Sequence, residues 1–155
     1  MSKASINKKV PAFKLPATGE QTIRLSELKG NNIVLYFYPK DSTPGCTLEG
    51  QDFRDSYRKF RARNTIILGV SRDNIKSHEK FKAAQKFPFE LIADEDETLC
   101  DIFDVVKMKN MYGKKVRGIE RSTFLIDSGG ILRKEWRKVK IDGHVDEVLE
   151  AVKNL

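Results

Sequence analysis

Apolar and polar positions early in the chain predict short strands and one tight turn of helix. Residues 13–15 and 22–25 alternate apolar and polar side chains around the turn-forming pair Thr18 and Gly19, which predicts an N-terminal hairpin. Residues 26–30 are typical of a single helical turn closed by glycine. The run 33–38 is apolar throughout, as expected for a strand buried on both faces of a sheet, and Pro39 ends it.

The next segment predicts a strand–helix–strand unit. Large apolar residues recur at near-helical spacing and predict a helix over 46–63: Leu48, Phe53, Tyr57 and Phe60. A second buried strand is predicted over 65–71. Such a crossover makes the two strands parallel and the connection right-handed.

The second half of the chain predicts further helices and a hairpin. A helix is expected over 74–87 with Ile75, Phe81 and Ala84 facing inward, then a short strand over 89–92 and a short helix over 97–103. A basic loop with a turn at 111–113 follows. Segments 122–127 and 131–136 flank a turn, which predicts a second hairpin. Apolar residues at i, i+3, i+4, i+7 spacing then predict a closing amphipathic helix over 145–152. This order predicts a thioredoxin-like α/β sandwich, a central mixed sheet flanked by helices, as a single domain over residues 1–155.

Composition favours a soluble cytoplasmic chain. The 155 residues are 39% hydrophobic and 33% charged, and no apolar stretch approaches the roughly 20 residues of a membrane span. Residues 1–7 lack the apolar core of a secretion signal. Two cysteines in a chain of this length argue against a disulfide scaffold and for a reducing compartment. We therefore expect no membrane partner.

The net charge of +7 is concentrated in one segment, which contains Lys107, Lys109, Lys114, Lys115 and Arg117. A solvated loop is the ordinary interpretation, and an acidic protein partner is the alternative. Acids and bases are interspersed elsewhere, and no ladder of aromatic residues for stacking bases is present. Nucleic acid is therefore not an expected partner.

Cys46 is the strongest candidate for a reactive residue in this chain. It follows the buried strand and opens the predicted helix, where unpaired amide groups and the helix dipole favour a negative charge. We expect it to be a thiolate, the reactive form, with a cation from elsewhere in the chain beside it. Pro39, Thr43 and Gly45 are expected to build a tight pocket for a small polar molecule.

Other cysteine chemistries fit the sequence less well. Thr43 stands where a Cys-x-x-Cys motif would place a second thiol, so disulfide exchange within the motif is excluded. A cysteine protease would need a histidine base, and His78 and His144 are expected on a helix surface and at a helix start. Two widely spaced histidines and two cysteines also make a poor metal site, so no metal is expected.

The segment 38–47, Tyr-Pro-Lys-Asp-Ser-Thr-Pro-Gly-Cys-Thr, closely resembles the active-site signature of peroxiredoxins. The lysine and aspartate after the proline, and the stretch 43–49, Thr-Pro-Gly-Cys-Thr-x-Glu, resemble the peroxiredoxin Q branch, also called bacterioferritin comigratory protein. Segment 118–127 resembles the second signature of that branch, and the similarity runs over nearly the whole chain. The resemblance implies a thiol peroxidase that needs no cofactor. Its substrates would be hydrogen peroxide and alkyl hydroperoxides.

The resemblance also implies roles for individual residues. Cys46 matches the cysteine that attacks peroxide and becomes a sulfenic acid, and Thr43 matches the hydroxyl that orients the peroxide. Pro39 matches the shielding proline. Arg121 matches the arginine that contacts thiolate and substrate, which is the expected cation.

The chain departs from the two-cysteine members of that branch. Gln51 occupies one position used for the resolving thiol, and the predicted helix 74–87 contains no cysteine. Cys100 matches neither arrangement and lies between apolar residues, which favours a core role. We therefore expect an external thiol (a thioredoxin, a glutaredoxin or a small thiol) to recycle Cys46, with a Cys46–Cys100 disulfide as the alternative.

Two further alternatives use the same chain differently. A peroxide sensor would oxidise Cys46 to change partner binding, and a binding module would use the basic segment around Lys114 without catalysis. The binding module leaves Thr43, Cys46 and Arg121 unexplained. The resemblance suggests a monomer, and no long exposed apolar strand edge is visible in the sequence.

Overall fold

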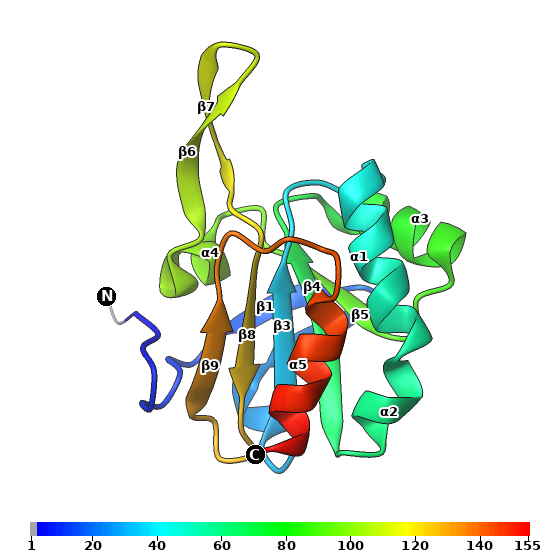
Figure 1. The fold of residues 1–155 in the computed structure, drawn as a ribbon, viewed down its shortest axis with the longest axis vertical. Helices are drawn as coiled ribbons and strands as arrows, with labels where there is room; N and C mark the ends of the chain where they lie inside the picture. Colours follow the sequence, from blue (N-terminus) through cyan, green and yellow to red (C-terminus); the bar gives the residue numbers. More distant parts are fainter. Residues whose placement is uncertain (1–2) are drawn as a thin grey trace.

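A seven-stranded mixed sheet organises the molecule, and β3 lies near its centre (Figure 1). The structure, a computed structural model, describes residues 3–155; Met1 and Ser2, part of the segment in which no secretion signal was expected, lie outside it. The strand order is β2-β1-β5-β4-β3-β8-β9, with β3, β4 and β5 parallel and the other pairs antiparallel. The strands are β1 (Lys14–Ala17), β2 (Gln21–Arg24), β3 (Asn32–Phe37), β4 (Thr65–Ser71), β5 (Glu90–Ala93), β8 (Ser122–Ile126) and β9 (Leu132–Trp136). The predicted mixed sheet and N-terminal hairpin are confirmed.

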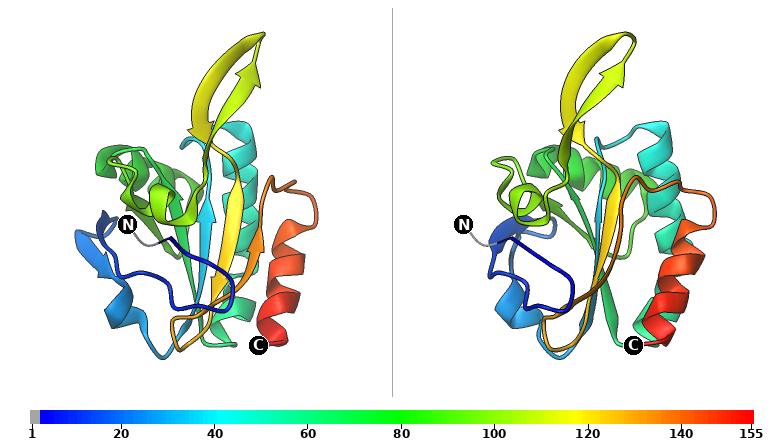
Figure 2. Two further views of the ribbon diagram at one scale, coloured as in Figure 1. Left: turned by 90° about the vertical axis from the view of Figure 1, so that its left-hand side faces the viewer. Right: turned by 60° about the vertical axis from the view of Figure 1, so that its left-hand side comes forward.

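Two separate cores cover the two faces of the sheet. One face packs against α1 (Pro44–Asp55), α2 (Tyr57–Arg61), α3 (Ile75–Gln85) and α5 (His144–Lys153); the other packs against the N-terminal segment, the 3₁₀ turn η1 (Leu25–Leu28) and α4 (Thr98–Phe103) (Figure 2). Side chains of β3 alternate between the two cores because successive residues of a strand point to opposite faces. Leu35 and Phe37 join the α4 side, whereas Tyr36 and Tyr38 join the α1 side.

The predicted helix over 46–63 is wrong in its continuity. The helix is interrupted at Ser56, whose φ of −101° and ψ of 4° separate α1 from α2. Leu48 lies on the exposed side of α1, while Phe53 and Phe60 are buried. In α3, Phe81 is buried as predicted but Ala84 is exposed, and the buried partner is His78. Near-helical spacing identified the helices but not which polar side chain faces the core.

The segment predicted as a basic loop is a β-hairpin that projects from the body of the protein (Figures 1 and 2). Its strands, β6 (Val106–Met111) and β7 (Lys114–Ile119), form a two-stranded sheet of their own. Tyr112 and Gly113 have φ values of 53° and 78°, so the predicted turn at 111–113 is confirmed as a two-residue hairpin turn with both φ values positive. The alternation of Val106 and Met108 with lysines is the strand signal that the charge pattern obscured.

None of the helices within residues 3–155 combines the length and the apolar character that crossing a bilayer requires.

Candidate active site

Cys46 lies at the start of α1, where the sequence placed it. Thr43 is the N-cap in extended conformation, and Pro44 and Gly45 precede Cys46 in the first turn. The amide groups of this turn have no acceptor within the helix and point toward the space before it. The Cys46 residue is only 2% exposed, so its sulfur is held in a site largely closed to water.

Arg121 lies directly against Cys46, although 75 positions separate the two residues in the chain. Arg121 lies between β7 and β8, and its Nη2 is 3.5 Å from Cys46 Sγ while its Nη1 donates to Glu49 Oε1 at 2.7 Å. Burial disfavours the charged guanidinium, but Glu49 and Cys46 outweigh it and raise the pKa of Arg121. The guanidinium therefore stays charged beside the sulfur, as the sequence predicted.

Glu49 is a part of the site to which the sequence analysis assigned no role. It is fully buried on α1, and its burial, opposed by Arg121, raises the pKa of its carboxyl from 4.5 to about 7. Its Oε2 has no hydrogen-bond partner within residues 3–155, whereas Oε1 holds Arg121. Its position three residues after Cys46, on the same face of a helix, was the available signal.

Gly45 leaves room for Arg121, which comes close to the backbone of α1. A Cβ atom at this position would lie 3.2 Å from Arg121 Nη2 and 3.3 Å from Ile141 Cδ1. Any side chain would press on the guanidinium and move it relative to Cys46. Arg121 thus makes a close approach to Gly45, where the sequence predicted the approach of a substrate.

Thr43 and Pro39 flank the start of α1. Thr43 Oγ1 donates to the Lys40 carbonyl oxygen at 2.8 Å, which leaves the lone pairs of the hydroxyl free to accept a hydrogen bond. Pro39 lies half-buried, two residues beyond the end of β3. Both therefore lie on the segment that joins β3 to the first turn of α1.

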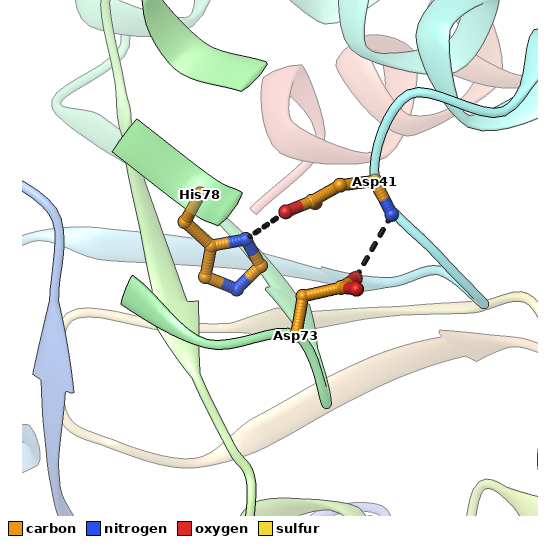
Figure 3. A group of neighbouring side chains, drawn as sticks. All are labelled: Asp41, Asp73 and His78. Carbon is orange, nitrogen blue, oxygen red and sulfur yellow. Dashed lines mark hydrogen bonds and ion pairs between the residues drawn. The ribbon is translucent and has the colours of Figure 1, made fainter. Parts of the chain in front are cut away.

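A buried network fixes the segment that carries Thr43 (Figure 3). Asp41 Oδ2 accepts a bond from Ser77 Oγ at 2.8 Å and lies 2.7 Å from His78 Nδ1; Asp41 Oδ1 accepts from Tyr38. The Asp41 amide donates to Asp73 Oδ2 at 2.9 Å. The network ties the β3–α1 loop to the start of α3.

The three residues Asp41, Asp73 and His78 bring possible metal-ligand atoms within 4.8 Å of one another, but hydrogen bonds within the protein already engage these atoms.

His78 is therefore not on a helix surface, as the sequence suggested, but fully buried. Its Nε2 lies 2.9 Å from the Ile92 carbonyl oxygen, which can only accept, so Nε2 carries a proton. Its Nδ1 faces the Asp41 carboxyl, so a second proton lies between these two groups. Both ring nitrogens hold protein groups in place, which assigns His78 to positioning rather than to nucleophile activation.

Removing the Asp41 carboxyl is expected to destabilise the fold by about 3 kcal/mol, because three buried donors lose their acceptor. Asp41→Ala should show this loss in urea unfolding at neutral pH. Asp41→Asn is the matched control, since its amide can donate to a neutral His78 and its oxygen can accept from Tyr38; we expect it to recover more than half of the loss. Equal losses in the two variants would contradict the network.

His144 starts α5 as predicted and is buried. Its Nε2 lies 2.8 Å from Thr123 Oγ1, and burial lowers its pKa from 6.5 to about 4. A neutral imidazole engaged with Thr123 has a structural role.

Cys100 lies in the other core, across the sheet from Cys46. Cys46 belongs to the core beneath α1, whereas Cys100 on α4 belongs to the core on the opposite face. Burial and then Asp94 raise the pKa of the Cys100 thiol well above its ordinary value. Both cysteines are free thiols. A bond between them would require a helix to leave its place on the sheet.

The comparisons with known proteins all point to one family. Residues 6–135 match the AhpC/TSA family. The chain is 50% identical to the peroxiredoxin Bcp of Bacillus subtilis, over 97% of this chain and 96% of that protein. It is 52% identical to the peroxiredoxin Bcp of Xanthomonas campestris, over 99% of this chain and 97% of that protein.

Solved structures give the same result. A structure of Xanthomonas campestris bacterioferritin comigratory protein, studied for its alkyl peroxide reduction activity, superposes with a TM-score of 0.87 at 52% identity, over 92% of this chain and 90% of that one. A cysteine-to-serine variant of Xylella fastidiosa PrxQ superposes with a TM-score of 0.92 at 43% identity, over 99% and 98% of the two chains.

Proposed function

Because the chain belongs to the AhpC/TSA family and is a peroxiredoxin of the Bcp type, a thiol peroxidase with a thioredoxin-like fold, we propose that Cys46 is its peroxide-attacking cysteine and that Thr43, Arg121 and Pro39 complete the site. The observation that carries this assignment is the contact of 3.5 Å between Arg121 Nη2 and Cys46 Sγ at the first turn of α1. It joins the two segments that carry the family's motifs.

The chemical step transfers one oxygen atom to sulfur. The Cys46 thiolate attacks the terminal oxygen of ROOH, the O–O bond breaks, and RO⁻ leaves and takes up a proton to give ROH. The sulfur is oxidised by two electrons to the sulfenic acid Cys46–SOH, and the peroxide is reduced by the same two electrons. Alkyl hydroperoxides and hydrogen peroxide both fit this scheme.

Charge builds up on the leaving oxygen during this step. Arg121 and the free amide groups at the start of α1 would stabilise it, because preorganised donors in a site closed to water are more effective than water itself. Glu49 holds the guanidinium in place through Nη1 and leaves Nη2 for the sulfur and the substrate. Pro39 donates no amide hydrogen bond and would shield the thiolate from water.

An external thiol would then reduce the sulfenic acid, in a cycle that uses one cysteine of this chain. The two cysteines lie on opposite faces of the sheet, which argues against the Cys46–Cys100 disulfide. A thioredoxin, a glutaredoxin or a small thiol could serve as reductant. Chain 1–155 would act as one domain, which the seven-stranded sheet shared by both cores supports. It would act as a monomer in the cytoplasm.

The Thr43 hydroxyl is expected to orient the peroxide, so its removal should slow oxidation of Cys46. We expect Thr43→Val to lower the second-order rate constant with hydrogen peroxide by about 10- to 100-fold, the value of one hydrogen bond to a developing charge. Stopped-flow fluorescence or competition kinetics would measure it. Thr43→Ser keeps the hydroxyl and should stay within a few-fold of the parent; equal losses in the two variants would refute an orienting role for the hydroxyl.

A further inference from the structure

The hairpin β6–β7 exposes apolar side chains that the fold does not use. Seven large apolar residues are exposed among those described, and four of them lie on this hairpin: Met108, Met111, Tyr112 and Val116. Tyr112 at the tip is 99% exposed. A fifth, Leu48, lies on α1 two residues after Cys46. Single exposed apolar residues are normal, but their concentration beside an active site marks a surface that binds something.

The hairpin is also strongly basic. Residues 106–119 contain five lysines and arginines and no acidic residue. Arg117 is paired with Glu97 and Lys107 with Asp104, so these two cations anchor the base of the hairpin. Lys109, Lys114 and Lys115 have no ion-pair partner within residues 3–155. Their charge is available to a partner.

One face of the hairpin combines these features, and the hairpin ends at Ile119, two residues before Arg121 of the site. Lys109 pairs with Val116 and Met111 with Lys114 across the strands, and directly paired residues of antiparallel strands share a face. Lys109 is half-buried, and burial and then Arg121 lower its pKa, with Cys46 opposing them. We call Lys109, Met111, Lys114 and Val116, with Tyr112 at the tip, the arm face.

We propose that the arm face docks a protein dithiol reductant whose surface around the attacking thiol is acidic and partly apolar. The inference rests on the proposed function, because a one-cysteine cycle needs an external thiol at Cys46. The first thiol of the partner attacks Cys46–SOH, forms a mixed disulfide and releases water. The second thiol attacks that disulfide, frees the Cys46 thiolate and leaves the partner as an oxidised disulfide, so the two electrons are accounted for.

The arm face fits this occupant better than two others. Nucleic acid would be held by cations at phosphate spacing and would gain little from Met111 and Val116. A second copy of this chain, paired through the same face, would set Lys114 against basic side chains, and like charges repel. An acidic partner with apolar side chains satisfies both the charges and the apolar residues.

The test compares two charge-reversed variants of equal net charge. Lys114→Glu/Lys115→Glu changes the hairpin; Lys59→Glu/Lys153→Glu changes exposed lysines on α2 and α5, far from it (Figure 1). The probes are two Cys-x-x-Cys peptides of equal length, one flanked by aspartates and leucines and one by lysines and leucines, and dithiothreitol. The readout is the rate at which each probe restores the Cys46 thiol after one equivalent of hydrogen peroxide.

We expect the hairpin variant to slow the aspartate peptide about tenfold or more, to speed the lysine peptide, and to leave dithiothreitol unchanged. The control variant should change the peptide rates less than threefold. Met111→Thr/Val116→Thr, which keeps β-forming residues, should slow both peptides. Equal effects of the two charge variants, peptide rates that no variant changes, or self-association that the hairpin variants abolish would overturn the proposal.

A failure of the proposed function would look different. In that case wild-type Cys46 would not be oxidised by hydrogen peroxide, or dithiothreitol itself would not restore its thiol. Binding of a DNA oligonucleotide that Lys114→Glu/Lys115→Glu removes, with unchanged peptide rates, would assign the arm face to nucleic acid and likewise overturn the docking proposal.

Discussion

Replacing Cys46 with serine is expected to abolish peroxide consumption, whereas Cys100→Ser should leave its rate unchanged. A serine hydroxyl is a poor nucleophile without a general base, and both histidines are held by structural partners. We expect Cys46→Ser to lose more than about 1,000-fold in rate, since no other group attacks the O–O bond. Stopped-flow mixing with hydrogen peroxide in the presence of dithiothreitol would measure both variants.

Counting thiols separates the two possible cycles. In a one-cysteine cycle, one equivalent of peroxide removes one titratable thiol per chain, in the wild type and in Cys100→Ser alike. A Cys46–Cys100 disulfide would remove two thiols from the wild type, and Cys100→Ser would then recover slowly. The second result would require a helix to move, because the two cysteines lie in different cores.

Most strands and the position of Cys46 followed from local patterns in the sequence. A run of six apolar residues rich in β-branched and aromatic side chains, as in 33–38, favours a strand buried on both faces of a sheet, so β3 and its partners were predictable. The thiol at the start of α1 followed because Pro44 favours a first turn there. Arg121 could be placed only through a motif, since 75 positions separate it from Cys46.

Features that depend on buried polar contacts were not predictable. His78 looks like a surface residue in a helical pattern because its burial depends on Asp41 and the Ile92 carbonyl, which only the folded chain brings to it. The role of Glu49 likewise depends on Arg121, from a distant segment. Sequence periodicity predicts which apolar side chains are buried. It does not predict which polar groups form hydrogen bonds in the protein interior.

Arg121→Met is expected to lower the second-order rate constant for peroxide about 100- to 1,000-fold, while the fold remains intact. Methionine keeps the apolar stem of the arginine side chain but supplies no donor and no charge, so both the thiolate and the leaving oxygen lose their cation. Comparing the rate of hydrogen peroxide reduction across pH separates these two effects. Loss of thiolate moves the pH profile to higher pH, whereas loss of leaving-group stabilisation lowers the plateau.

The same variant gives a second readout through Glu49. Arg121 opposes the effect of burial on this carboxyl, whose pKa is about 7, so without the guanidinium the Glu49 pKa should rise further and the carboxyl should be protonated at neutral pH. Carboxyl stretching bands in infrared spectra would then shift to the protonated form in Arg121→Met, and Arg121→Met/Glu49→Gln would lack that band. Arg121→Lys keeps the charge but not the fork that reaches Glu49 and Cys46 together, so it should recover only part of the rate. Full recovery by lysine would mean that charge alone, and not the geometry of the guanidinium, sustains the reaction.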